Sequence, residues 1–439
     1  MSARITVIGT GYLGATHAAC MAELGHEVIG VDVDETKLAA LADGRVPFYE
    51  PALEPMLARH VESGRLRFTT SFAEAADFGD VHFVCVGTPQ RPDSLAADMS
   101  HVDSAVTALA EHLRRPALVV GKSTVPVGTA SRLLDLIHAT APAGEQVSLA
   151  WNPEFLREGH AVDDTLHPDR LVFGVVRTED EATLREVYAI ALAEGTPTVT
   201  TDFATAELVK VAANSFLATK ISFINAIAEI CEVVDADVVA LADAIGHDAR
   251  IGRSFLNAGL GFGGGCLPKD IRAFMARAGE IGASDALTFL REIDSINMRR
   301  RQRAVEITRE LLGGTVLGAH IAVLGVAFKP ESDDVRDSPA LNVAGQLQLQ
   351  GAQVKVYDPK AMDNAKRMFP TLHYVDSVTA AAQHADIVLH LTEWAEFAAL
   401  DPVQVGTLVK QQVVIDGRNT LDAPRWRAAG WTYRGLGRP

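Results

Sequence analysis

One cysteine lies in a segment whose residue types suit covalent chemistry. Residues 259–265 of GLGFGGGCLPKDIRAF are mostly glycine, which lets the backbone wrap closely around a ligand, and Cys266 follows directly. Pro268 fits the first turn of a helix, so Cys266 is expected at or just before a helix N-terminus. There the helix dipole and free N–H groups favour a thiolate, and Asp270 would lie one turn further along. The segment therefore predicts a nucleophilic cysteine.

The other three cysteines carry no such signal. Cys20, Cys85 and Cys231 form no CxxC pair, which argues against a disulfide framework and against a zinc site. The histidines likewise form no HxxxH or HExxH pattern, so no metal is expected. A lone cysteine is usually a small buried side chain, and we interpret these three in that way.

A pair of glutamates follows one of the predicted strands. In AWNPEFLREG, Asn152 is predicted to cap a short helix that begins at Pro153 and stops at Gly159. That helix would place Glu154 and Glu158 on one face. Such a pair is more often a solvated face than a site, so it gains weight only if the fold brings it to the cysteine.

A second polar pair interrupts an otherwise apolar helical pattern. In ELVKVAANSF, Lys210 and Asn214 are four residues apart, and most of their neighbours are apolar. A cation and an amide donor are the groups needed where negative charge develops on an oxygen. The alternative interpretation is again a solvated helix face.

A dinucleotide site is predicted at the start of the chain, where the motif GTGYLG follows the strand ITVIG and precedes a helical segment. Gly9 allows a tight turn, Gly11 lets a pyrophosphate approach the backbone, and Gly14 lets the helix pack closely on the strand. The next strand ends at Asp32, which would accept a ribose 2′-OH and repel a 2′-phosphate. Lys37 weakens that repulsion slightly. NAD is therefore expected rather than NADP.

These residues must be positioned by sheets with helices packed against them. Short apolar runs that end in turns alternate with amphipathic segments, which is typical of a parallel sheet covered on both faces. Residues 204–244 show a helical pattern without Pro or Gly, and residues 269–312 are helical again. Strands are expected in RITVIG, HEVIGVD, VHFVCVGTP, ALVVGKST and VSLAWNPE, and later in HIAVLGVAF, AQVKVYDP, ADIVLHL and VVIDGR.

The predicted fold class is therefore α/β. We expect two Rossmann-like, doubly wound parallel-sheet domains, joined by a central all-helical dimerisation region with a long spine helix. The expected domains are 1–200, which binds NAD, 201–312, which is helical, and 313–439, which binds a nucleotide sugar. A homodimer or a larger homo-oligomer is expected from the spine helix.

Composition excludes several classes of partner. The chain has 439 residues, of which 40 are basic and 56 acidic, and a net charge of −16 would repel nucleic acid. No apolar run reaches the ~18 residues of a membrane span. The N-terminus MSARITVIGT lacks the pattern of a signal peptide and is needed as a strand, so a cytoplasmic protein is expected.

The second α/β end differs from the first. It carries Gly325-Val326-Ala327 in place of the dinucleotide motif, so we do not predict a second dinucleotide there. Its loop AFKPESDDVRDSP places Lys329 and Arg336 after the end of a strand, where ligands of open sheets bind. The alternative is that both are solvated loop charges.

The ordered set GTGYLG, VGTPQ, GKSTVPVGT, NPEFLREG, ELVKVAANSF, GLGFGGGCLPKD, GVAFKPESDDVRDSP and IDGR resembles the UDP-glucose/GDP-mannose dehydrogenase family. The resemblance covers nearly the whole chain, and it is strongest to the UDP-glucose 6-dehydrogenase branch. It implies a four-electron, NAD-dependent oxidation of the C6 alcohol of a nucleotide sugar to a uronate. A thiohemiacetal and then a thioester would form on Cys266. UDP-glucose is the favoured substrate.

The same resemblance implies residue roles. Lys210, Asn214 and Asp270 would stabilise the alkoxide and thiohemiacetal oxygens, while Glu154, with Thr124 and Asp270 holding a water, would assist hydrolysis. Arg250 would reach the substrate bound to the other subunit. The residues expected at NAD are Gly9, Gly11, Tyr12, Leu13, Gly14, Asp32, Lys37, Thr88, Thr124, Glu158 and Arg336. Those expected at the substrate are Glu154, Phe155, Leu156, Lys210, Asn214, Arg250, Phe255, Asn257, Gly263, Phe328, Lys329 and Arg418.

Two departures from the family pattern leave the sugar and the base open. Gly265 stands where serine is common, and Leu267 stands where phenylalanine is frequent in the UDP-glucose branch. GDP-mannose, dTDP-glucose and UDP-N-acetylmannosamine are the alternative substrates. A one-hydride dehydrogenase of the hydroxyacid or 6-phosphogluconate type, which would not need Cys266, is a different hypothesis. A catalytically silent NAD-binding regulator is the third.

Overall fold

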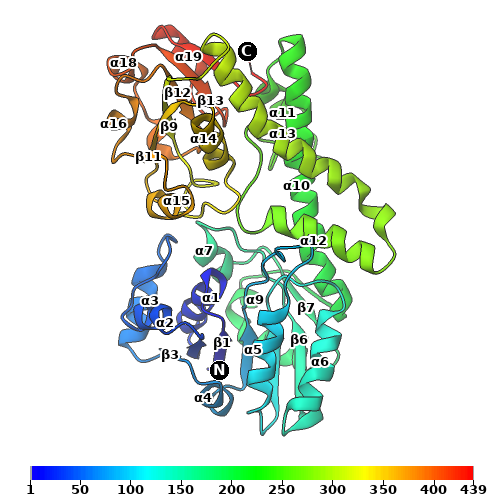
Figure 1. The fold of residues 1–439 in the computed structure, drawn as a ribbon. Helices are drawn as coiled ribbons and strands as arrows, with labels where there is room; N and C mark the ends of the chain where they lie inside the picture. The colour runs from blue at the N-terminus through cyan, green and yellow to red at the C-terminus, as the bar shows by residue number, and fades with distance from the viewer. Residues whose placement is uncertain (1, 439) are drawn as a thin grey trace. The chain divides into compact units, whose positions relative to one another are not determined.

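A computed structural model describes residues 2–438, which form two compact units (Figure 1). The first unit contains the described residues up to Ala213 together with Arg272–Gly282. The second contains Asn214–Ile271 and the residues from Ala283 onward. Each unit is built on a sheet of mainly parallel strands, and long helices occupy the centre of the chain. The predicted fold class is confirmed.

The sheet of the first unit has eight strands in the order β3-β2-β1-β4-β5-β6-β7-β8. All neighbouring strands are parallel except β6 and β7. The sequence predicted β1, β2, β4, β5 and β6 but missed the other three, which are only four residues long. The strands are β1 (Arg4–Ile8), β2 (Glu27–Val31), β3 (Leu66–Thr69), β4 (Val81–Val84), β5 (Ala117–Gly121), β6 (Val147–Trp151), β7 (Leu171–Gly174) and β8 (Thr198–Thr201).

Helices cover both faces of this sheet, and the alternation of strand residues separates two cores. Along β5, Leu118 and Val120 join one apolar cluster and Val119 joins the other. Helices α1, α3 and α7 contribute to the first cluster, and α4, α5 and α6 to the second. The helices are α1 (Tyr12–Glu23), α2 (Glu35–Ala42), α3 (Leu53–Glu62), α4 (Phe72–Phe78), α5 (Ser100–Ala110), α6 (Thr129–Thr140), α7 (Ala161–Leu166), α8 (Thr178–Val187) and α9 (Ala189–Ala193), with a 3-10 turn η1 (Gly144–Gln146).

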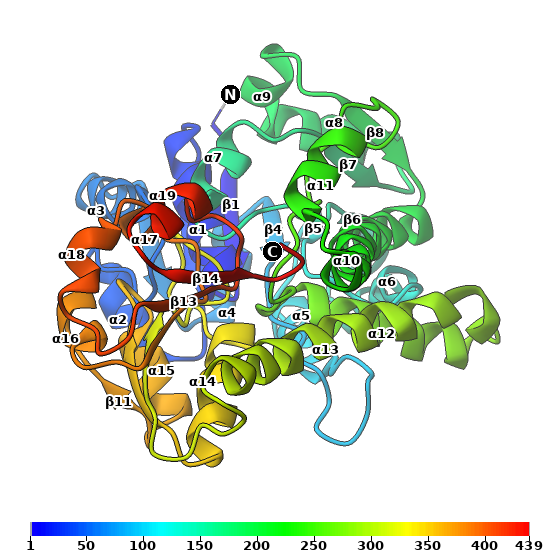
Figure 2. The same ribbon diagram turned by 90° about the horizontal axis from the view of Figure 1, so that it is seen from above.

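The second unit has a six-stranded parallel sheet in the order β11-β10-β9-β12-β13-β14. β9, β10, β12 and β13 were predicted, whereas the two edge strands were not. Helix α13 lies beside α14, as Figure 2 shows. The strands are β9 (His320–Leu324), β10 (Gln353–Tyr357), β11 (His373–Tyr374), β12 (Ile387–His390), β13 (Val413–Asp416) and β14 (Thr432–Gly435); the helices are α14 (Pro339–Leu349), α15 (Met362–Met368), α16 (Val378–Ala382), α17 (Ala395–Ala398), α18 (Pro402–Gly406) and α19 (Ala423–Ala428).

The central helical segments are shorter than the periodicity predicted. The expected run 204–244 is divided into α10 (Phe203–Val234) and α11 (Val238–Gly246). The chain turns at Asp235, whose φ is 58°, and Asp237 caps α11 by accepting from the Val239 and Ala240 N–H groups. The second run contains α12 (Leu267–Glu280), a 3-10 turn η2 (Ser284–Leu287) and α13 (Thr288–Leu311). In the described part of the chain, none of the helices has both the length and the apolar character that a bilayer crossing requires.

Candidate active site

The three glycines of the N-terminal motif meet different constraints at the β1–α1 turn. Gly9 has a φ of 87°, and its N–H donates to the Val31 carbonyl over 2.8 Å. A Cβ on Gly14 would lie 1.7 Å from the Gly9 oxygen, whereas a Cβ on Gly11 would meet no described atom within 4 Å. The first turn of α1 has neither a capping side chain nor an acidic residue. The open space and the free N–H groups there fit a pyrophosphate.

Asp32 follows the end of β2, as predicted, and is almost buried. Its Oδ2 accepts from the Thr10 backbone N–H over 2.8 Å, from the Thr10 hydroxyl and from Lys37 Nζ at 2.8 Å. Burial by itself would raise the pKa of Asp32, but the bonds from Lys37 and the backbone bring it below the ordinary value. The carboxylate therefore stays ionised, and in this form it would accept a hydrogen bond from a ribose hydroxyl.

Tyr12 was predicted to contact NAD, and its side chain is hydrogen-bonded within the first unit. The Tyr12 hydroxyl donates to Glu50, a buried carboxylate that the sequence analysis did not single out. Glu50 also accepts from the Gly159 and Ala161 N–H groups over 2.7 Å each, so it caps α7. Glu158 adjoins Gly159 and is half-buried. Leu13 packs at the edge of the first core.

Thr88 lies in the loop after β4. Its hydroxyl donates to the carbonyl of Thr124 over 2.8 Å, and its side chain is buried. Thr124 lies after β5 and is half-buried. The bond therefore holds together two loops at the carboxyl end of the sheet, the edge at which ligands of such sheets bind.

The short helix predicted after β6 is absent: residues 152–157 form an extended loop. The Asn152 side chain does not cap a helix, because its Oδ1 accepts from Lys122 Nζ and from the Tyr188 hydroxyl while its Nδ2 donates to the Val172 carbonyl. These tertiary partners prevail over the local capping preference. The loop still carries Glu154, whose Oε2 accepts from the Leu156 N–H over 2.6 Å.

Glu154 and Lys210 form a nearly buried ion pair. Lys210 Nζ on α10 lies 2.9 Å from Glu154 Oε1, and both side chains are nearly buried. The same ammonium lies 5.6 Å from the centre of the Phe155 ring. Burial by itself would raise the pKa of Glu154, but Lys210 and the backbone bond from Leu156 hold it below the ordinary value. Glu154 is therefore a carboxylate at neutral pH.

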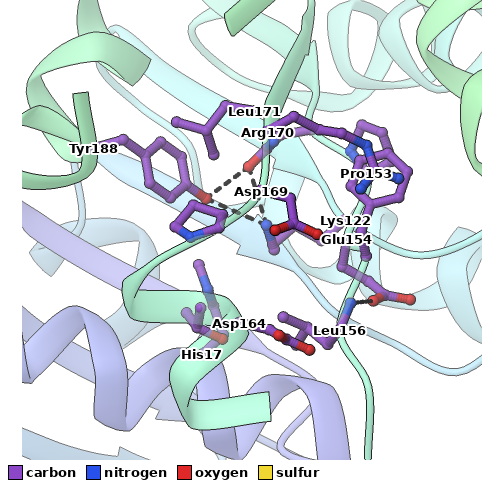
Figure 3. A pocket seen from close by; sticks show the side chains of 14 residues that line it. His17, Lys122, Pro153, Glu154, Leu156, Asp164, Asp169, Arg170, Leu171 and Tyr188 are labelled. Carbon is purple, nitrogen blue, oxygen red and sulfur yellow. Dashed lines mark hydrogen bonds between the residues drawn. The ribbon is translucent and has the colours of Figure 1, made fainter. Parts of the chain in front are cut away.

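A cavity of about 40 Å³ opens beside this loop (Figure 3). Several polar side chains that the sequence analysis did not single out line it, and Lys122 and Tyr188 point toward each other there. Lys122 lies within the motif GKSTVPVGT, but the residues that surround its side chain are distant along the chain, so local spacing did not indicate its place. The lining residues are His17, Lys122, Asn152, Pro153, Glu154, Phe155, Leu156, Asp164, Thr165, Pro168, Asp169, Arg170, Leu171 and Tyr188.

In the second unit, Cys266 directly precedes α12, which confirms the predicted helix N-terminus. Its carbonyl accepts the first helical bond, from the Asp270 N–H over 2.9 Å, and its side chain is exposed. Cys20, Cys85 and Cys231 are buried, as expected, and burial raises the pKa of Cys85 to about 12. Only Cys266 among the cysteines therefore combines access with a helix N-terminus.

Asp270 joins Asn214 in one buried pair. Asn214 Nδ2 donates to Asp270 Oδ2 over 2.6 Å, and Lys269 Nζ donates to Asp270 Oδ1 over 2.6 Å. Asn214 and Asp270 are both less than a tenth exposed. The structure thus brings together Cys266, Asp270 and Asn214 within one unit, and Lys210 stands one turn before Asn214 on α10.

The glycine-rich loop is held by residues of α10 and α13. Asn297 both accepts from the Phe262 N–H, over 2.8 Å, and donates to the Phe262 carbonyl, over 3.0 Å. Asn225 accepts from the Gly259 N–H over 2.9 Å, and Arg300 donates to the Gly259 carbonyl. These fully buried polar residues were missed; an asparagine or arginine at an otherwise apolar helical position is the signal that could have found them.

The glycines nearest Cys266 leave no room for side chains. A Cβ on Gly264 would lie 2.8 Å from the Phe328 ring, and one on Gly265 would lie 2.3 Å from the Arg336 guanidinium carbon. Gly263 is closed in by the Asp337 carbonyl, 2.4 Å from a Cβ position. A serine in place of Gly265 would therefore require Arg336 to move.

The remaining predicted cations of this unit are engaged within it. Arg418 donates to the carbonyls of Leu391, Gly261 and Phe328 over 2.8–3.1 Å, so its guanidinium joins three loops. Arg336 pairs with Asp334 at 2.7 Å. Lys329 Nζ lies 5.5 Å from the centre of the Phe328 ring.

Three residues predicted at the substrate lie in the segment after α11. The Arg250 side chain is 90% exposed and pairs with Asp248 at 2.6 Å. Phe255 has a φ of 66° and is partly exposed, and Asn257 accepts from Arg253.

The chain matches the UDP-glucose/GDP-mannose dehydrogenase family in all three of its parts. The NAD binding domain matches residues 3–192, the central domain residues 204–299 and the UDP binding domain residues 322–423. These matches confirm the resemblance and the NAD cofactor that the sequence motifs predicted.

Curated relatives extend along the whole chain. The UDP-glucose 6-dehydrogenase TuaD of Bacillus subtilis is 41% identical, over 99% of this chain and 93% of that protein. The UDP-glucose 6-dehydrogenase of Rhizobium meliloti is 42% identical, over 99% of this chain and 100% of that protein. Among solved structures, a UDP-glucose dehydrogenase from Pyrobaculum islandicum aligns with a TM-score of 0.92 at 37% identity, covering 100% of this chain and 98% of that one. A UDP-D-ManNAc dehydrogenase from Pyrococcus horikoshii aligns with a TM-score of 0.86 at 27% identity, with 99% of each chain covered.

Proposed function

Because this chain belongs to the UDP-glucose/GDP-mannose dehydrogenase family, whose members are NAD-dependent, we propose that it oxidises the C6 alcohol of UDP-glucose to the carboxylate of UDP-glucuronate. One water is consumed and two NADH are formed. The observation that carries this proposal is the placement of Cys266, which is exposed at the start of α12 with Asp270 and Asn214 in the same unit.

The NAD-binding residues are those of the β1–α1 turn. Gly11 leaves open space before the uncapped N-terminus of α1, and Asp32 is an ionised acceptor at the end of β2. When bound, NAD+ supplies the acceptor for each of the two hydrides that the sugar loses. The proximity of Thr88 and Thr124 at the same sheet edge supports their assignment to this site. Glu158 and Arg336 are proposed at NAD from the family resemblance alone.

Cys266 is the proposed nucleophile. Once the alcohol has become an aldehyde, the thiolate adds to the aldehyde carbon and the carbonyl oxygen becomes the oxygen of a thiohemiacetal. Loss of the second hydride from that carbon leaves a thioester on Cys266. The aldehyde is then never released, because it stays bound to the protein.

Lys210, Asn214 and Asp270 are proposed to stabilise the oxygen that carries charge in both oxidations. A buried cation and an amide donor favour an alkoxide in a way that water cannot, since they are already oriented. Asn214 is oriented by its bond to Asp270, and Lys210 by its pair with Glu154. Lys329 and Arg418 are proposed at the anionic end of the substrate.

Glu154 is proposed to assist hydrolysis of the thioester. A water held by Thr124 and Asp270 would attack the thioester carbon, pass a proton to the Glu154 carboxylate and release the Cys266 thiolate. The lowered pKa of Glu154 keeps its carboxylate ionised at neutral pH, which is the form that can accept this proton.

The UDP moiety is supported by the match to a UDP binding domain and by relatives named for UDP-glucose. The second candidate is the same chemistry on UDP-N-acetylmannosamine, favoured by the likeness to the Pyrococcus horikoshii enzyme. GDP-mannose and dTDP-glucose complete the set to be tested, since Gly265 and Leu267 depart from the UDP-glucose pattern.

We also propose a homodimer that forms through α10. Phe216, Phe223 and Ile230 recur at seven-residue spacing on this helix and are 66%, 49% and 58% exposed. A row of large apolar side chains at this spacing is an unpartnered helix face, which a second copy would cover. Arg250 would then serve the substrate of the other subunit.

The test is the number of NADH formed per nucleotide sugar consumed. UDP-glucose, dTDP-glucose, GDP-mannose and UDP-N-acetylmannosamine are run side by side, with Cys266→Ser as the control. Two NADH from UDP-glucose, with the serine variant stalled, are expected. One NADH per sugar, or turnover by the serine variant at the wild-type rate, would favour the one-hydride hypothesis. Binding of NAD without turnover of any sugar would favour the silent regulator.

A further inference from the structure

A buried lysine adjoins the loop that carries Glu154. Lys122 follows the end of β5 and is only 7% exposed. Its Nζ donates to Asn152 Oδ1 over 3.0 Å and to the Tyr188 hydroxyl over 3.2 Å. Lys122 and Tyr188 are labelled in Figure 3. The ammonium also lies 5.8 Å from the centre of the Phe83 ring. Lys122 was not among the site residues predicted from the sequence.

Burial of this ammonium costs stability at neutral pH. Burial lowers the pKa of Lys122 to about 8, so the group is still mostly protonated at pH 7. Because the folded-state pKa lies below that of the unfolded chain, this cost is present below pH 8 and is relieved as the pH rises above it. Lys122 Nζ and the Tyr188 hydroxyl both donate to Asn152 Oδ1, the hydroxyl over 2.6 Å. Stability alone therefore does not account for a charged donor at this position.

The groups that surround Lys122 are mostly uncharged. His17 on α1 is fully buried, both of its ring nitrogens lack a described partner, and burial holds its pKa well below the ordinary value. Burial raises the pKa of Cys85 to about 12 and raises that of Tyr188 as well. These three are neutral at pH 7, so they neither balance nor screen the ammonium.

The charged groups near Lys122 are those of the proposed site. Lys122 is attracted to Glu154 and repelled by Lys210. At the mouth of the cavity, Asp164 is paired with Arg157 at 2.5 Å, and Arg170 lies over the Phe155 ring at 3.7 Å. Asp169 completes the rim and is exposed to solvent. Lys210 contacts Glu154 directly, at 2.9 Å, and Lys122 lines the same cavity as this carboxylate.

Asn152 connects Lys122 to the loop after β6. Its backbone N–H donates to the Gly121 carbonyl over 2.8 Å, and its side chain donates to the Val172 carbonyl over 3.0 Å. Glu154 follows two residues later along an extended backbone. A displacement of Asn152 would therefore move the carboxylate directly.

We propose that Lys122 is a positioning residue of the active site: through Asn152 it anchors the loop that carries Glu154, and it places a second cation in the cavity that this carboxylate lines. This inference rests on the proposed function, in which Glu154 assists thioester hydrolysis. The lysine is retained for hydrolysis at a cost in stability.

The experiment compares Lys122→Met with Tyr188→Phe. The methionine variant removes the charge at nearly constant volume, whereas the phenylalanine variant removes only hydrogen bonds and keeps the charge. Each is measured for thermal midpoint, for the pre-steady-state burst of NADH with UDP-glucose, and for the pH dependence of kcat. Lys122→Gln, which keeps a donor for Asn152 but no charge, takes the place of the methionine variant if that variant does not fold.

We expect Lys122→Met to keep or raise the thermal midpoint, to form two NADH per site in a burst, and then to turn over about tenfold more slowly at pH 6–7. The acidic limb of its kcat profile moves to higher pH, because removing a cation raises the pKa of Glu154. Tyr188→Phe keeps the limb in place. An unmoved limb in the neutral variant that folds, Lys122→Met or Lys122→Gln, overturns the inference. If the wild-type enzyme forms only one NADH per sugar, the proposed function itself is wrong. That outcome is distinct from an unmoved acidic limb.

Discussion

The Glu154 carboxylate and the Lys210 ammonium are 2.9 Å apart in the first unit, in a pair whose side chains are 11% and 6% exposed. The pair joins the loop after β6 to helix α10, so it fixes a proposed base and a proposed oxyanion stabiliser relative to each other. Removing one partner of a buried pair leaves the other charge uncompensated, commonly at a cost of about 3–5 kcal/mol. Substitutions here must therefore be judged on folding as well as on activity.

Glu154→Gln is expected to stop the enzyme at the thioester. Glutamine keeps the volume of the side chain but is no base, so two NADH per site should form in a burst and hydrolysis should slow by about 10²–10⁴-fold. Intact-protein mass spectrometry should detect the acylated Cys266. Lys210→Met is the companion variant, in which the first oxidation should fail instead. Multiple turnovers of Glu154→Gln at the wild-type rate would exclude the proposed role.

Gly11→Ala and Gly14→Ala form a matched pair. A methyl group on Gly11 enters open space, and the φ of −68° there suits alanine, so the fold should keep its thermal midpoint while the KM for NAD rises about tenfold or more. A methyl group on Gly14 would lie 1.7 Å from the Gly9 oxygen, so this variant should lose stability. Equal behaviour of the two variants in calorimetry and NAD titration would contradict this account.

Asp32→Ala is expected to relax the preference for NAD. The substitution removes the carboxylate that would repel a 2′-phosphate and leaves Lys37 Nζ, which now lies 2.8 Å from Asp32, without that partner. The ratio of kcat/KM for NADP to that for NAD should rise by at least tenfold. Adding Lys37→Ala should reverse most of the gain for NADP. No change in the ratio would place the 2′-position away from Asp32.

Asn297→Asp should destabilise the loop that carries Cys266. The carboxylate would lose the donor to the Phe262 carbonyl and bury a charge beside it, at a cost of about 3 kcal/mol or more. The thermal midpoint and kcat should fall together. Met298→Ala, at the neighbouring 42% exposed position, is the control and should leave both unchanged. A stable Asn297→Asp variant with normal kcat would show that the loop does not depend on this bond.

Phe223→Glu on α10 should dissociate the proposed homodimer, because it places a charge in an apolar contact. Sedimentation velocity should show a monomer, with activity lost in proportion if Arg250 serves the other subunit. Val176→Glu, at a 69% exposed apolar residue of the first unit, is the matched control and should remain a dimer. Wild-type protein that sediments as a monomer would contradict the proposal.

The elements whose signals are contiguous in sequence could be predicted. The turn of Gly9, Gly11 and Gly14, the acidic end of β2 and the position of Cys266 before α12 depend on local backbone geometry, which neighbouring residues dictate. The apolar runs of β1, β5 and β9 are strong for the same reason, because strands buried on both faces are continuously apolar. The short strands β7 and β8 were missed because four residues carry too little periodicity.

Distant hydrogen-bond partners decided the rest. From the sequence, Asn152 was predicted to cap a helix. In the fold, Lys122 after β5 and Tyr188 after α8 donate to its side chain instead, and the segment is an extended loop. Asp235 ends α10 through a single left-handed residue that no helical period reveals. Sequence alone therefore determined the dinucleotide motif, the position of Cys266 before a helix and the fold class, since these follow from local conformation and apolar pattern. Only the tertiary structure determined which buried charges adjoin Glu154 and which side chains hold the glycine-rich loop, because those contacts join residues far apart in the chain.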